Sequence, residues 1–171
     1  VQLRTLPGAE DYAFHAMFTH AQLKQADRFP VAQLLRDGPQ ILRAFSEHIA
    51  ALIGYWDFPV STVLPLLRAP LGLPGPSLEA VLRCEHKYWS RLCQQEVVPE
   101  YLPAFCSVDP FDTDPLSQVT LPMPFWLKPV KAVLSHLGFR IDNEADFDAA
   151  IARIRARIGR YAEPFNLILD L

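Results

Sequence analysis

The chain has 171 residues and a mass of 19.3 kDa, enough for one ordinary domain or two small lobes with a buried core. Hydrophobic residues make up 50% of it and charged residues only 20%, which excludes an intrinsically disordered chain and a coiled coil. The formal net charge of -3 provides no basic field, so we expect no binding to nucleic acid or to an anionic membrane.

Several features separate the chain from membrane and exported proteins. No apolar run approaches the ~20 residues of a bilayer-spanning helix, because prolines and an arginine interrupt the most apolar stretch, residues 60–73. The first residues lack the charged segment and apolar core of an export signal. The three cysteines are odd in number and have no metal-binding spacing, which fits reduced thiols. We therefore expect a cytoplasmic protein with no membrane segment.

The first part of the chain alternates between predicted strands and helices. Residues 12–18 and 49–55 are short apolar runs bounded by turn residues, and each predicts a buried strand. A helical stripe over residues 31–45 follows the first run, with Gly38-Pro39 marking a kink or a split into two short helices. A second helix is predicted over residues 60–71. The predicted order is β-α-β-α.

The composition changes beyond a proline-rich connector that ends at Pro76. Ser77 is a suitable N-cap for a long helix that continues to about residue 95, with apolar residues at spacings of three and four. Residues 97–124 are rich in proline and aspartate, which predicts a loop around one short strand at residues 104–108.

A hairpin and a helix are predicted next. Residues 125–130 and 137–141 have the composition of two antiparallel strands joined by a turn over residues 131–136. Asn143 can cap a last helix, in which apolar residues recur at helical spacing as far as Tyr161.

The final segment, residues 165–171, is apolar and has no turn signal after it. Interpreted as a strand, it has no later partner, and natural domains normally cover an exposed apolar edge. This pattern predicts a fragment or a chain that needs a partner, and it predicts self-association through the C-terminal segment.

The short motifs of common nucleotide and metal sites are absent, namely the dinucleotide fingerprint, the phosphate loop, the nucleophile elbow and the paired-histidine zinc motif. Lys128 stands out, because it lies between Leu127 and Pro129 in an apolar predicted strand. An unpaired buried ammonium is costly, so this side chain must reach the surface, pair with a carboxylate or face a polyanionic ligand. The residues alone leave these alternatives open.

Two short patterns resemble those of the ATP-grasp enzymes, in particular biotin carboxylase and the carboxylate–amine ligases. The first is His86-Lys87-x-x-x-Arg91 in the long helix, and the second is Lys128-Pro129-Val130 in the strand before a loop. Their order, their spacing and the preceding β-α-β-α segment resemble the family over most of the chain.

The resemblance implies both a fold and a function. The fold is α/β, with a Rossmann-like lobe over residues 1–76, then a linking helix and a first, incomplete α+β ATP-grasp subdomain over residues 77–171. The function is that of the ATP-binding part of a ligase, which activates a small carboxylate substrate as an acyl phosphate for attack by a nitrogen nucleophile. Mg²⁺ would accompany ATP, with its acidic ligands in a second half beyond Leu171, so this chain alone is expected to be inactive.

The resemblance also assigns site residues. Lys87 and Lys128 would contact the α and β phosphates of ATP, since phosphoryl transfer depends on positive charge near the phosphate oxygens. The segment from Lys131 to Gly138 would fold over the triphosphate, and Ser135 and the loop amides would donate hydrogen bonds. This loop departs from the family pattern because it has one glycine where many members have several.

Other polar residues have simpler interpretations. The five histidines lack the i, i+4 spacing of a helical metal site, and we expect hydrogen-bonding roles for them. Asp57 follows the second predicted strand, where α/β folds bind ligands, so it either binds substrate or caps the next helix, and the cap is favoured. The alternative function for the whole chain is a non-catalytic interaction or ligand-sensing module.

Overall fold

The computed structural model describes residues 2–25, 27–45 and 48–171, which are mostly helical with one small sheet. The helices are α1 (Val31–Arg43), α2 (Val60–Arg68), α3 (Leu78–Glu85), α4 (Lys87–Val97), α5 (Glu144–Arg157) and α6 (Gly159–Leu169). The strands β1 (Phe125–Leu127) and β2 (Phe139–Ile141) form an antiparallel pair in which Trp126 lies opposite Arg140. Short 3-10 helices lie at Gln2–Thr5, Ala9–Asp11, Ala69–Leu71, Pro99–Tyr101 and Pro115–Gln118, and a π-helical turn lies at Ala21–Gln25. Helices with a small sheet agree broadly with the predicted mixed class.

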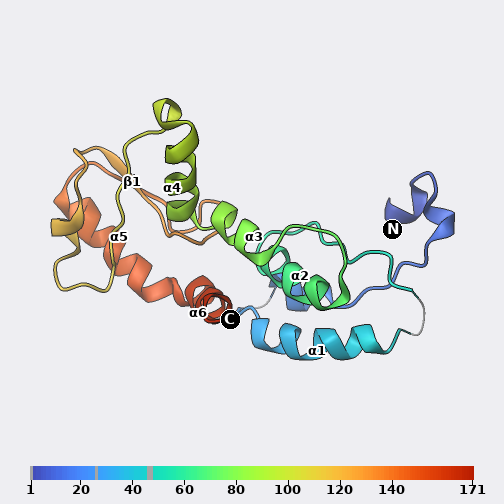
Figure 1. Ribbon diagram of the computed structural model, residues 1–171. Coiled ribbons are helices and arrows are strands. Elements are labelled where there is room, and N and C mark those ends of the chain that lie inside the picture. The colour runs from blue at the N-terminus through green and yellow to red at the C-terminus, as the bar shows by residue number, and fades with distance from the viewer. Residues whose placement is uncertain (1, 26, 46–47) are drawn as a thin grey trace.

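The first hydrophobic core lies where α1, α2 and α6 meet (Figure 1). Phe58 is fully buried just before α2, with its ring 5.4 Å from that of Phe29 and 5.8 Å from that of Phe165. Close helix packing is possible because Gly38 of α1 faces Leu67 of α2, where a Cβ would come within 2.7 Å of the leucine side chain. The helix α1 continues through Pro39 without the predicted split.

A second core lies between the hairpin and α5. Ile141 and Phe147 are fully buried there, and Phe125 packs against them from β1. The predicted N-cap is confirmed, since the Asn143 side chain accepts a hydrogen bond from the Asp146 N–H. The hairpin itself is also confirmed, although its strands are shorter than predicted.

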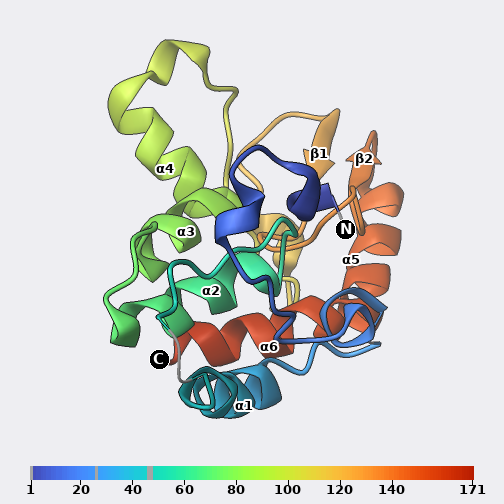
Figure 2. The same ribbon diagram turned by 90° about the vertical axis from the view of Figure 1, so that its right-hand side faces the viewer.

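Between the two cores, the predicted long helix consists of two helices. Ser77 caps α3 as predicted, but His86 has an extended backbone that ends α3 and begins α4. The His86 ring accepts a hydrogen bond from the Trp89 N–H through Nδ1 and stacks on the Trp89 ring. This local side-chain cap competes with helix continuation, and α4 projects away from the body of the molecule as a result (Figures 1 and 2).

Three predicted strands are wrong. Residues 12–18, 49–55 and 104–108 have irregular backbone, and the only sheet among the described residues is the β1–β2 pair. An apolar run forms a strand only where a neighbouring segment completes its backbone hydrogen bonds. The second run is also not buried throughout, since Tyr55 is 93% exposed. The β-α-β-α order is therefore not found in the part of the chain that the structure describes.

The C-terminal segment is a helix rather than the predicted edge strand. Residues 165–169 belong to α6, in which Phe165 and Ile168 are buried in the first core and Leu167 and Leu169 are partly exposed. Helical spacing thus places Phe165 and Ile168 on the buried face of α6, and Leu167 and Leu169 on the face that is partly exposed to solvent. The strand-edge reason for self-association is removed, while self-association itself stays a prediction.

We predict that Phe165→Ala lowers the free energy of unfolding by about 3–5 kcal/mol, because it leaves a cavity among the core rings. Leu171→Ala is the matched control, since that side chain is 71% exposed, and a change within about 0.5 kcal/mol is expected for it. Urea unfolding followed by circular dichroism measures both. Equal midpoints for the two variants would contradict the packing of α6 in the first core.

Candidate functional site

The hairpin presents Lys128 directly after β1, on the exposed face of the strand. Phe125 and Leu127 point toward the second core, so the period of two places Trp126 and Lys128 on the opposite face. The Lys128 ammonium lies 5.3 Å from the centre of the Trp126 ring. Of the three alternatives for this lysine, pairing with a carboxylate does not occur within the described residues.

Lys87 is held against the same part of the chain by its backbone and its side chain. As the first residue of α4, it has an N–H without an intrahelical acceptor, and this group donates to the Val130 carbonyl at 2.9 Å. Its Nζ donates to the Ala132 carbonyl, also at 2.9 Å. The break at His86 therefore positions Lys87 on the segment that follows β1.

Lys131 is the buried lysine of this region, with only 4% of its surface exposed. Its Nζ lies 3.0 Å from Oδ1 of Asp57 and 2.8 Å from Oε2 of Glu85. Asp57 precedes α2 and Glu85 ends α3, so the ammonium joins three separate segments. The favoured role of Asp57 as a helix cap is wrong, because α2 has no side-chain cap and the carboxylate instead binds Lys131.

The loop over residues 131–138 is tightly wound. Leu134, Ser135 and Leu137 have φ angles of 52°, 57° and 56°, in the left-handed region that non-glycine residues seldom adopt. The Gly138 N–H donates to the Ser135 carbonyl at 3.1 Å, which closes the turn.

Gly138, the only glycine of this loop, provides space rather than a positive φ. A Cβ at this position would lie 3.3 Å from the Ser135 carbonyl oxygen and 3.7 Å from Cγ of Lys128. The loop and the Lys128 side chain therefore pack closely, and Ser135 stands exposed at the turn.

The three lysines share one electrostatic environment. Burial of the Lys87 ammonium under the loop lowers its pKa, and the positive charges of Lys131 and Lys128 lower the pKa further, against the opposing effect of Asp57. The structure thus brings together all five predicted residues: Lys87, Lys128, Lys131, Ser135 and Gly138. The sequence analysis does not predict Trp126, which is 64% exposed beside Lys128 and gives the site a flat apolar surface. The available signal was an aromatic residue two positions before the lysine, on the same face of a strand.

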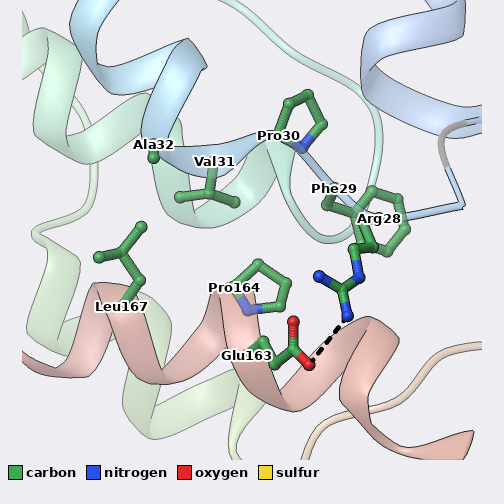
Figure 3. Close-up of a pocket in the computed structure, with 8 residues that line it drawn as sticks. All are labelled: Arg28, Phe29, Pro30, Val31, Ala32, Glu163, Pro164 and Leu167. Atoms are coloured by element: carbon green, nitrogen blue, oxygen red, sulfur yellow. Dashed lines mark hydrogen bonds and ion pairs between the residues drawn. The ribbon is translucent and has the colours of Figure 1, made fainter.

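Two hollows lie elsewhere on the molecule. A cavity of about 180 Å³ lies between the start of α1 and α6 (Figure 3). The two charged residues that line it, Arg28 and Glu163, form an ion pair with each other at 3.4 Å. A groove of about 490 Å³ between α3, α4 and the end of α6 is lined mainly by leucines and Trp89. Neither includes any of the five predicted residues.

Comparison with known proteins gives no relative: no family model, no curated protein and no solved structure matches the chain. In the described ranges, no group of three or more His, Cys, Asp or Glu side chains could hold a metal ion. No helix in these ranges is long and apolar enough to cross a membrane.

We predict that the Lys87 ammonium titrates below the ordinary lysine value of 10.5. Because the folded protein binds this proton less tightly than the unfolded chain, the free energy of unfolding should rise with pH between the two pKa values. The ¹³Cε chemical shift of Lys87, followed against pH, measures the pKa. In Lys87→Met, the free energy of unfolding should rise less with pH, because the contribution of the Lys87 ammonium is absent. A Lys87 titration at or above 10.5 would contradict the described environment.

Proposed function

We propose that the protein is the ATP-binding part of an ATP-grasp-like ligase, which activates a carboxylate as an acyl phosphate for attack by a nitrogen nucleophile. The observation that carries the proposal is the convergence of Lys87 and Lys128 on one loop. The two lysines come from separate motifs, and the resemblance assigns both of them to the phosphates of ATP. In the described residues they lie against the chain between Val130 and Gly138.

The chemistry of these groups suits a polyphosphate. An ammonium has three donors, and the hydrogen bond to Ala132 uses one of those on Lys87. Neither Lys87 nor Lys128 is neutralised by a carboxylate ion pair within the described ranges. Ser135 adds a hydroxyl donor at the exposed turn, and the exposed ring of Trp126 offers a stacking surface for a purine.

In the proposed reaction, a carboxylate oxygen of the substrate attacks the γ phosphorus of ATP, and the bond to the β–γ bridging oxygen breaks to release ADP. The nitrogen nucleophile then attacks the acyl carbon and forms the C–N bond, inorganic phosphate leaves as the C–O bond breaks, and the nitrogen gives its extra proton to solvent. Negative charge develops on the phosphate oxygens and the bridging oxygen during the first step. Lys87 and Lys128 would supply the fixed positive charge that stabilises it.

The finer fold assignment is part of this proposal. We assign residues 77–171 to a linking helix and a first ATP-grasp subdomain, supported by the hairpin packed on α5. We assign residues 1–76 to a Rossmann-like lobe, supported only by α1 and α2, because the two strands expected there are irregular. Magnesium does not fit the described residues, which lack a cluster of three candidate ligands, so no step here depends on it.

We predict that Lys87→Ala and Lys128→Ala each weaken binding of ATP by about 2 kcal/mol, the scale of a lost charge-assisted contact. Arg36→Ala removes one exposed positive charge from α1 and serves as the control. Titration of the ¹⁵N-labelled protein with MgATP, followed by amide NMR, measures the affinity and locates the response. The parent should respond at residues 128–138, and the control variant should titrate like the parent.

Two outcomes would reject the phosphate assignment. One is an unchanged affinity in both lysine variants. The other is the absence of any response to ATP at residues 128–138 of the parent, which would favour the alternative of a non-catalytic interaction or ligand-sensing module.

A further inference from the structure

The buried Lys131 has a different environment from the two exposed lysines beside it. We use the name Lys131 cluster for Lys131, Asp57 and Glu85. Both carboxylates lie within 3.0 Å of Nζ, and Glu85 is itself mostly buried. The Asp57 Oδ1 atom also accepts a hydrogen bond from the Phe58 N–H at 2.7 Å, which fixes the carboxylate.

Aromatic rings of the first core complete the surroundings of this ammonium. Nζ lies 5.3 Å from the centre of the Phe58 ring and 6.0 Å from that of the Phe165 ring. Both rings are fully or almost fully buried. The first residue of the loop is thus anchored to the first core, and the ammonium has carboxylates and ring faces around it.

We infer that Lys131 is a positioning residue of the candidate ATP site, which holds Asp57 and Glu85 in ion pairs so that Lys87 and Lys128 stay available for the ligand. This inference rests on the proposed function, and it gives Lys131 a different role from the resemblance, which places it at the start of the segment that folds over the triphosphate. The residue acts through the loop and through Lys87, without touching ATP.

Burial and charge both oppose a direct contact. Lys131 is 4% exposed, so a phosphate would have to enter a packed region to reach Nζ. It would also have to approach two carboxylates, and like charges at close range repel strongly where water is excluded. Lys87 and Lys128 are more accessible, because both side chains reach the surface and neither pairs with a carboxylate in the described ranges, although the Lys87 ammonium is partly covered where it contacts Ala132.

The inference has a specific consequence for a chain without Lys131. Two carboxylates would then lack a cationic partner, which is costly, most of all for the mostly buried Glu85. Asp57 already acts electrostatically on Lys87, so the Lys87 ammonium is a candidate replacement. Capture of Lys87 by Asp57 would remove it from the ligand, and neutralising the carboxylates should return it.

The experiment compares four proteins by MgATP titration with amide NMR: the parent, Lys131→Met, Lys131→Arg, and the triple variant Lys131→Met with Asp57→Asn and Glu85→Gln. Thermal unfolding of each protein identifies a temperature at which all are folded. We expect Lys131→Met to weaken ATP binding about tenfold, and the triple variant and Lys131→Arg to bind within about threefold of the parent.

Two results would overturn the inference. A triple variant that binds ATP no better than Lys131→Met would mean that the ammonium itself contacts phosphate. A folded Lys131→Met that binds ATP like the parent would mean that the cluster has no influence on the site. If Lys131→Met does not fold, the triple variant, which leaves no unpaired charge, is compared with Lys131→Arg. A triple variant that binds ATP much more weakly than Lys131→Arg would then overturn the inference.

Failure of the proposed function is recognised separately, because the parent would then give no ATP response. In that case the ¹³Cε titration of Lys87 tests the inference without nucleotide. Lys131→Met should raise the Lys87 pKa, because the positive charge of Lys131 is removed and Asp57 is released, and adding Asp57→Asn should reverse the part of the rise that comes from Asp57. A Lys87 titration that is the same in all variants would overturn the positioning role.

Discussion

The buried ammonium of Lys131 is the constraint on which the arrangement of the site depends. A lysine in a packed interior is stable only with carboxylate partners, and here they come from the start of α2 and the end of α3. These partners are 74 and 46 positions away in the sequence. Satisfying one charge therefore fixes the hairpin loop against both the first core and the helix pair, and the Lys87 contacts form at the same junction.

Local features of this fold could be predicted from the sequence, since their causes lie within a few residues. Ser77 and Asn143 cap their helices as expected, because each hydroxyl or amide oxygen has a backbone N–H within one turn. The expected strands at residues 12–18 and 49–55 failed for the opposite reason. A strand depends on a partner segment, and an apolar run carries no information about whether that partner is present.

The candidate site likewise has features with local causes in the sequence and features that depend on distant segments. The motifs in the sequence indicate Lys87 and Lys128, and these two lysines lie against the segment between Val130 and Gly138. The resemblance also places Lys131 in the segment that folds over ATP, because nothing in Pro129-Val130-Lys131 indicates that Lys131 is buried while Lys128 is exposed. That difference arises from Asp57 and Glu85, and only the folded chain brings those carboxylates to Lys131.

Charge balance supports the proposal of an anionic ligand. Asp57 and Glu85 are both used by Lys131, so the two lysines nearest the surface have no carboxylate ion pair among the described residues. Partial burial of the Lys87 ammonium and the positive charges of Lys131 and Lys128 lower the Lys87 pKa, which is a cost that the folded chain carries without a ligand. A bound polyphosphate would relieve this cost by favouring the charged form. An ion pair between Lys87 and a protein carboxylate would also favour the charged form of Lys87. That carboxylate would, however, take the place of the proposed polyphosphate beside the ammonium.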